Sequence, residues 1–220
     1  MVGISTYGVL AAFAALVRAE LLDEMTWTSG LELTTADGDK YEVDFMLCGR
    51  ERRAGPRGEP VIAFGEAKTG GAFGGRGRGG KQSGFGPAEL RKARALAECF
   101  PDVGFVFTTL APTLTTQEQR ALSAFVRAQR RARRGPVLVL TGRELLANES
   151  FLAVWNDVGA GSVERKLATD VVQSGSFHAA ADATVHLYLN VPLSEDWPSY
   201  SEVDSAPPRR ARRPPKRPAA

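Results

Sequence analysis

Two acidic residues and a lysine are the clearest candidates for chemistry in this sequence of 220 residues. Asp44 lies in the alternating apolar and polar segment 41–47, and Glu66 and Lys68 lie at the end of the apolar segment 60–68. Both segments have the pattern of strands, and side chains two residues apart in a strand project from one face. Residues 50–59 are rich in glycine, proline and charge, which predicts a hairpin loop that brings Asp44 beside Glu66 and Lys68.

Such a trio suits a divalent cation and a phosphate. Two carboxylates a few ångströms apart repel each other unless a cation lies between them. Mg²⁺ prefers oxygen ligands and usually binds one or two carboxylates together with substrate phosphate. Asp44 and Glu66 are therefore candidate ligands for Mg²⁺ (or Mn²⁺), and the backbone carbonyl of Ala67 is a third. A protonated Lys68 can orient an attacking water and offset charge on a phosphate, so the trio predicts phosphodiester hydrolysis.

Asp44 followed by Glu66-Ala67-Lys68 at the end of an apolar strand resembles the PD-(D/E)XK nuclease superfamily. Val43 occupies the position of the proline in that motif, which many members lack. The resemblance implies a restriction-endonuclease-like fold and a Mg²⁺-dependent nuclease acting on DNA, in restriction, repair or phage defence. The alternatives are a non-catalytic nucleic-acid-binding or assembly module of the same fold, and a solvated strand face with an ordinary Glu–Lys ion pair.

The resemblance also implies an acidic residue on the first helix that joins the metal site. Residues 5–24 are predicted to form this helix, and its apolar stripe, which includes Leu16 and Val17, ends at Glu20. Glu20 is therefore a candidate catalytic residue, and Glu24, one turn later, is the fallback. The alternative for Glu20 is a helix-end glutamate that reaches solvent.

The order of the predicted elements favours the same fold. After the first helix, three strands, a helix and a strand are predicted in turn over residues 31–35, 41–47, 60–68, 87–100 and 103–110. This αβββαβ order predicts an α/β core with a central mixed sheet flanked by helices. A further helix, a strand and a short helix are predicted over residues 115–134, 136–140 and from 141 onward.

Three regions are predicted along the chain. Residues 1–146 would form the nuclease core. Residues 147–200 would form a C-terminal helical extension, with helices at Phe151–Trp155 and Phe177–Leu189. Residues 201–220 are rich in proline and arginine, contain no large apolar cluster, and are predicted to be disordered.

Positive charge is concentrated in three segments. Arg76, Arg78 and Lys81 alternate with glycine after the strand that carries Lys68, so they are candidate nucleic-acid-binding residues, the alternative being a surface insertion without a partner. The tail 206–220 has six basic residues and no acidic one, and either binds a polyanion or only confers solubility. The arginines from 127 to 134 either complement a helix dipole or contact a DNA backbone.

Other chemistries find little support in the composition. Cys48 and Cys99 have no partners at metal-ligand spacing, and His178 and His186 both lie late in the chain, so neither zinc nor nucleophilic catalysis is predicted. The apolar start, residues 4–17, is predicted to be a helix of a cytoplasmic protein without a membrane partner. The expected partner is nucleic acid, most simply DNA, and cutting both strands would suit a homodimer or a larger nuclease complex.

Overall fold

A computed structural model describes residues 4–52, 59–68, 84–147, 150–156, 161–195 and 197. Arg76, Arg78, Lys81 and the tail predicted to be disordered lie outside these residues. Within them the elements follow the order α1 (Ile4–Ala19), β1 (Leu22–Thr34), β2 (Lys40–Glu51), β3 (Pro60–Lys68), α2 (Pro87–Cys99), β4 (Gly104–Thr109), α3 (Thr116–Arg131), β5 (Val137–Leu140), α4 (Gly142–Leu145), α5 (Phe151–Asn156), α6 (Val163–Ser174) and α7 (Phe177–Leu189).

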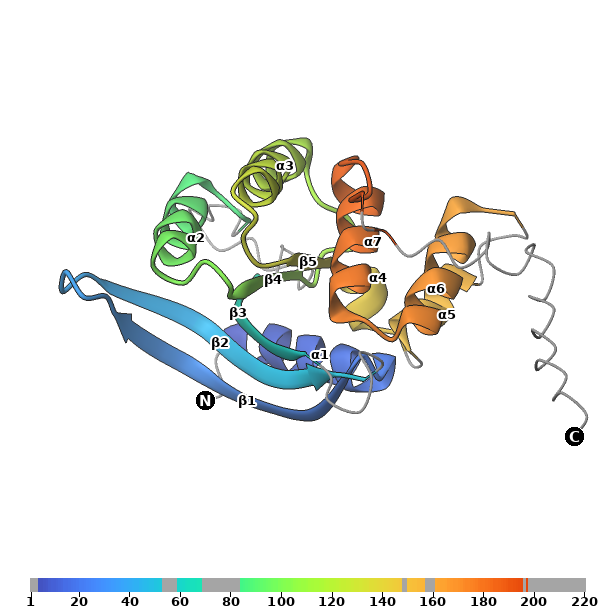
Figure 1. Ribbon diagram of the computed structural model, residues 1–220, viewed down its shortest axis with the longest axis horizontal. Coiled ribbons are helices and arrows are strands. Elements are labelled where there is room, and N and C mark those ends of the chain that lie inside the picture. The colour runs from blue at the N-terminus through green and yellow to red at the C-terminus, as the bar shows by residue number, and fades with distance from the viewer. Residues whose placement is uncertain are drawn as a thin grey trace, which may run out of the picture.

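The five strands form one mixed sheet in the order β1-β2-β3-β4-β5 (Figure 1). The pairs β1–β2 and β2–β3 are antiparallel, and the pairs β3–β4 and β4–β5 are parallel. The first two strands extend beyond the rest of the sheet as a long hairpin (Figure 1). This arrangement confirms the predicted α/β class and the central mixed sheet flanked by helices.

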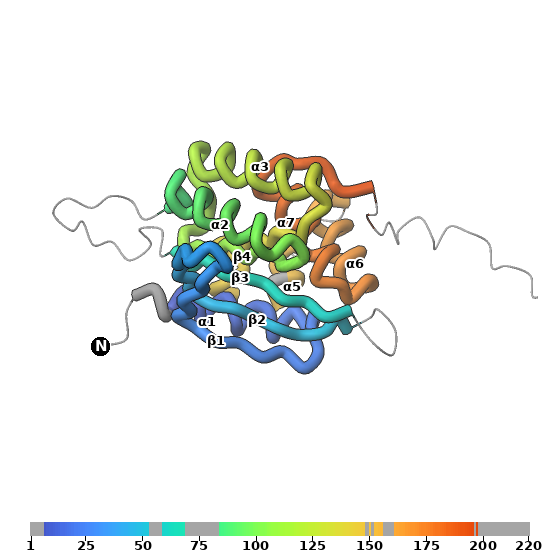
Figure 2. Tube along the Cα trace, turned by 60° about the vertical axis from the view of Figure 1, so that its left-hand side comes forward, coloured from blue at the N-terminus to red at the C-terminus, as the bar shows by residue number. Residues whose placement is uncertain are grey.

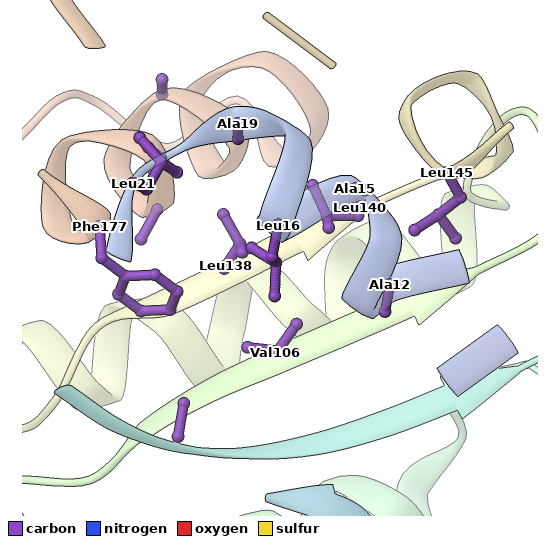
Figure 3. Packing of buried hydrophobic residues seen from close by; sticks show 14 of the residues in the cluster. Ala12, Ala15, Leu16, Ala19, Leu21, Val106, Leu138, Leu140, Leu145 and Phe177 are labelled. Atoms are coloured by element: carbon purple, nitrogen blue, oxygen red, sulfur yellow. The ribbon is translucent and has the colours of Figure 1, made fainter. Parts of the chain in front are cut away.

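Helices cover both faces of the sheet, with α1 on one face and α2 and α3 side by side on the other (Figures 1 and 2). Under α1, Ala12, Ala15 and Leu16 pack towards Val106 and Leu138 of the sheet (Figure 3). Alanine and glycine on this helix permit close packing, since a Cβ on Gly8 would lie 3.2 Å from the Cβ of Ala67 in β3.

The opposite core is aromatic. Phe105 and Phe107 of β4 meet Phe125 of α3 edge-to-face, with ring centroids 5.4 and 5.7 Å apart, and Phe85 meets Phe107 in the same way. These rings are almost completely buried, and such pairs stabilise a core beyond their area of contact. Phe107 lies beside Glu66 in the sheet, so this core packs next to the end of β3 that carries Glu66 and Lys68.

Helix α7 closes the sheet at β5. The Oγ1 atom of Thr184 accepts a hydrogen bond from the backbone amide of Val139 at 3.1 Å, so a helix side chain replaces the next strand. Residues of α7 belong to both hydrophobic cores, with Phe177 and Ala183 in one and Val185 and Leu189 in the other. The region predicted as a C-terminal extension therefore completes the packing around the sheet.

The first helix and first strand differ from their predicted bounds. Helix α1 ends at Ala19, and β1 begins at Leu22 instead of Leu31. Glu20 and Glu24 have left-handed backbone φ values of 53° and 52°, so neither continues a helix. The segment around Trp27 is rich in threonine, and aromatic and β-branched residues favour strands. Helix α6 was not predicted, and none of the helices in the described residues is long and apolar enough to cross a membrane.

A buried glutamate at the end of β2 anchors the start of α7. Glu51 accepts hydrogen bonds from the Ser176 hydroxyl at 2.8 Å and from the backbone amide of His178 at 3.1 Å, and its Oε1 lies 2.8 Å from His178 Nδ1. The bond with Glu51 raises the pKa of His178, and Glu59 and Asp182 add to that rise. The hydrogen bonds from His178 and Ser176 outweigh burial and lower the pKa of Glu51.

This pair predicts a stability maximum in mildly acidic solution. The contribution of His178 is complete below its ordinary pKa of 6.5 and is lost as the pH rises through its raised folded value. The contribution of Glu51 is complete above its ordinary pKa of 4.5 and is lost as the pH falls through its lowered folded value. His178→Asn should therefore reduce the free energy of unfolding most between these two ordinary pKa values, by less than about 1 kcal/mol because the imidazole is half exposed. An equal reduction at pH 9 would contradict the assignment.

Candidate active site

The candidate site lies where β2 separates from β3. Phe45 pairs with Gly65, and the pairing of the two strands continues from there to Arg50 and Pro60. Beyond Phe45, β2 stays paired with β1 alone. At the point of separation, Asp44 Oδ2 accepts a hydrogen bond of 2.7 Å from the backbone amide of Ala67. A carboxylate thus takes the place of a strand partner and lies against the end of β3.

Glu66 and Lys68 project from the face of β3 that α2 covers. Glu66 is 8% exposed, and its Oε1 lies 2.7 Å from Lys68 Nζ. Its other oxygen, Oε2, lies 2.5 Å from Nζ of Lys92 in α2. Each oxygen of this buried carboxylate therefore contacts an ammonium group, one from its own strand and one from a helix.

Glu89 joins the start of α2 to the same cluster. Its Oε2 accepts a hydrogen bond from the Gly86 amide at 3.0 Å, and its Oε1 lies 3.7 Å from Lys68 Nζ. Pro87 at the first turn and a carboxylate at the third helical position are typical of a helix start. The residue that caps α2 therefore also holds Lys68 in position.

The cluster combines three carboxylates with two ammonium groups in a partly buried place. Burial raises the pKa of Asp44; the hydrogen bond from Ala67 opposes this rise and the charge of Glu66 adds to it. Burial alone would raise the pKa of Glu89, but hydrogen bonds from backbone amides and the charges of Lys68 and Lys92 lower it. Among the described residues the three carboxylates of the cluster outnumber its two ammonium groups by one, which favours a further cation at this place.

Lys68 remains an ammonium group at neutral pH. Burial alone would lower its pKa, but the hydrogen bond and charge of Glu66, with the charges of Asp44 and Glu89, raise it above the ordinary value of 10.5. A protonated lysine donates hydrogen bonds and cannot accept the proton of an attacking water. Its chemistry is therefore positioning and electrostatic stabilisation.

An apolar pocket adjoins these charges between β3 and α2. Its lining includes Val43, Phe64, Ala93 and Leu96, beside the charged residues of the cluster. Apolar walls lower the local dielectric constant, so the charges of Glu66 and Lys92 interact more strongly than they would in water.

The structure does not bring Glu20 into the site, so the prediction for this residue is wrong. Glu20 is 68% exposed and pairs with Arg52, just beyond the end of β2. Arg52 lies eight residues from Asp44, which at roughly 3.3 Å per residue places it about 25 Å along the strand. Glu24, the fallback, is also exposed and pairs with Arg50. The start of α1 lies near the site, since a Cβ on Gly8 would lie 3.2 Å from the Cβ of Ala67, so the far end of the helix, which precedes both glutamates, is directed away from it.

Two residues of the cluster were missed by the sequence analysis. Glu89 and Lys92 lie three residues apart on α2, so they share one side of that helix. The helix itself was predicted, but which charged side faces β3 depends on how Leu90, Ala93 and Leu96 pack. The orientation of α2 relative to β3 therefore cannot be obtained from the helix sequence alone.

The donor set fits a hard divalent ion in its chemistry. Asp44 and Glu66 supply carboxylate oxygens at one strand end, and Mg²⁺ commonly binds two carboxylates and completes its shell with water and phosphate. Across the part of the chain that the structure describes, no group of three or more His, Cys, Asp or Glu side chains is arranged to hold a metal ion. The two ammonium groups on Glu66 occupy oxygens that an ion would use. Ala67 contributes its amide, which binds Asp44, and its carbonyl stays a predicted ligand.

Comparisons with known proteins identify no related protein. No protein-family model matches the chain, and no curated protein and no solved structure matches it.

Proposed function

We propose that this protein is a metal-dependent nuclease of the PD-(D/E)XK type, with a restriction-endonuclease-like fold, that hydrolyses phosphodiester bonds of DNA. The observation that carries the proposal is the hydrogen bond of Asp44 to the amide of Ala67, between Glu66 and Lys68, where β2 separates from β3. The chain order α1-β1-β2-β3-α2-β4, which is the αβββαβ order of that fold, supports it.

The residues have distinct roles in this proposal. Asp44 and Glu66 would hold Mg²⁺ or Mn²⁺, which would neutralise phosphate charge and lower the pKa of a bound water. Lys68 enters as an ammonium group, orients the attacking water and stabilises the charge that develops on the phosphate oxygens. The water oxygen bonds to phosphorus while the bond to the leaving oxygen breaks; the water gives up a proton to solvent, and the leaving oxygen takes one up from solvent. Glu89 is a positioning residue, because it holds Lys68 from the start of α2.

The surface of α2 and α3 supports a nucleic-acid partner. Arg120, Arg127 and Arg131 lie seven and four residues apart, so they form one exposed ridge along α3. Exposed Arg91 and Arg94 lie on the neighbouring α2 (Figure 2). No acidic residue occurs in the sequence between positions 119 and 135. Such a ridge attracts a phosphate backbone without reading its sequence.

Removing two charges of this ridge tests the partner. Arg127→Gln combined with Arg131→Gln should weaken duplex DNA binding and reduce the slope of log K against log salt by about 1.8, since each lost phosphate contact contributes about 0.9. The matched control is Arg165→Gln with Lys166→Gln, two exposed cations on α6. Fluorescence anisotropy at several salt concentrations measures the slope. Equal slopes for the ridge variant and wild type would show that these arginines do not contact DNA and only complement the dipole of α3.

The second candidate function is a non-catalytic nucleic-acid-binding or assembly module. One observation favours this module: the ammonium group of Lys92 contacts Glu66 Oε2. In a protein of this fold that had lost catalysis, such a cationic side chain would take the place of the metal ion. One experiment distinguishes the nuclease from the binding module. The wild-type protein is incubated with supercoiled plasmid, linear duplex, single-stranded DNA and RNA, each in Mn²⁺, Mg²⁺ or EDTA. Metal-dependent cleavage of any of them supports the nuclease; binding of the panel without cleavage supports the module.

A further inference from the structure

Glu66 is paired with two ammonium groups, one more than the proposed chemistry needs. Lys68 follows it by two residues in the strand and is part of the motif. Lys92 comes from α2 and makes the shorter of the two contacts, 2.5 Å against 2.7 Å. A divalent ion held by Asp44 and Glu66 must lie against at least one of these Glu66 oxygens, because metal–oxygen bonds are about 2.1 Å long. The ammonium group on that oxygen then competes with the ion for it.

Lys92 is the ammonium group that is free to leave. Lys68 is 18% exposed and is also held by Glu89. Lys92 is 26% exposed, and among the described residues its ion pair is with Glu66 alone. Its four-carbon stem stands on a helix at the rim of the apolar pocket, so a change of rotamer carries the ammonium towards solvent without moving the backbone.

We propose that Lys92 is the resident counter-ion of Glu66, that it gives up this contact when a divalent ion binds, and that it thereby sets the metal affinity of the site. This inference rests on the proposed function, because it assumes the metal centre at Asp44 and Glu66. Lys92 is a positioning residue in this account. It pairs with the second oxygen of this buried carboxylate in the metal-free protein, while Lys68 pairs with the first.

The test is direct metal binding in the absence of nucleic acid. Mn²⁺ is titrated by calorimetry into wild type, Lys92→Gln, Lys92→Met, Lys92→Arg and Arg94→Gln. Both neutral variants at position 92 should bind Mn²⁺ about tenfold more tightly than wild type, because a competing charge beside the site is removed. Lys92→Arg keeps the charge and should bind within about twofold of wild type. Arg94→Gln loses a charge from the exposed side of the same helix and controls for net charge.

The outcomes separate this inference from the proposed function. If Lys92→Gln and Lys92→Met bind no more tightly than Arg94→Gln, the counter-ion role is wrong. In that case Mn²⁺ binding by wild type that Asp44→Asn abolishes would still support the metal centre. If neither wild type nor the position-92 variants bind Mn²⁺ at millimolar concentration, both the counter-ion role and the metal centre are contradicted. Melting curves in EDTA establish that each variant is folded, and one folded neutral variant suffices.

Discussion

Asp44→Asn is expected to reduce metal-dependent DNA cleavage by about a thousandfold or more, with DNA binding unchanged or tighter. An amide is a poor ligand for a hard divalent ion, whereas its oxygen still accepts the hydrogen bond that Ala67 donates to Asp44. The loss of ion and charge stabilisation at the phosphate accounts for an effect of this order. Removing a negative charge also relieves its repulsion of the DNA backbone.

Glu42→Gln is the matched control for this variant. Glu42 lies two residues earlier in the same strand, is exposed, and loses the same charge on substitution. Cleavage rates under excess enzyme measure chemistry, and anisotropy with labelled duplex in EDTA measures binding. If Asp44→Asn cleaved DNA at the wild-type rate, Asp44 would have no part in the mechanism. If Glu42→Gln also lost a thousandfold in cleavage rate, the loss of any negative charge on this strand would account for the effect.

Gly65→Ala is expected to destabilise the fold by about 3 kcal/mol, at the upper end of the usual cost of overpacking a core. A Cβ at position 65 would lie 2.0 Å from Cζ of Phe45, whose ring covers this glycine across the β2–β3 pair. Asp44 precedes that ring and Glu66 follows that glycine. The contact therefore fixes the register that brings the two carboxylates together.

Urea unfolding of four proteins tests the contact. These are wild type, Gly65→Ala, Phe45→Leu and the double variant. Leucine is smaller than phenylalanine, so the double variant should be more stable than the sum of the two single effects predicts, by about 1 kcal/mol or more. Additive effects would show that Phe45 does not limit the size of the residue at position 65.

The strands that carry the candidate site could be predicted from sequence because their signals are local. Alternation places Glu66 and Lys68 on one face, and a polar loop between two apolar strands predicts the hairpin. The structure brings Asp44 to Ala67 as that hairpin requires. Gly65 also carried a usable signal, since a glycine inside a strand often marks close approach of another group.

The rest of the site depends on packing between distant segments. Lys92 reaches Glu66 only because α2 turns one polar side towards β3, and the sequence does not state the angle of that helix. Glu20 was misplaced because the sequence does not state which end of α1 lies near the site: Gly8 at the start of the helix packs against Ala67, and Glu20 follows its far end. Helix α7 covers β5 through the hydrogen bond from the Val139 amide to the Thr184 hydroxyl, and these two residues lie 45 positions apart in the sequence.

The central claim is that Asp44, Glu66 and Lys68 form a hydrolytic centre, and the most direct test is plasmid cleavage by wild type beside Lys68→Ala. Both proteins are incubated with supercoiled DNA in Mn²⁺ and in EDTA. Lys40→Ala is the control, because Lys40 lies at the far end of the hairpin and pairs with exposed Glu32. The account predicts nicking by wild type and Lys40→Ala in Mn²⁺ alone, and at least a hundredfold slower nicking by Lys68→Ala. Equal nicking by wild type and Lys68→Ala, or no nicking by folded wild type that still binds DNA, would contradict it.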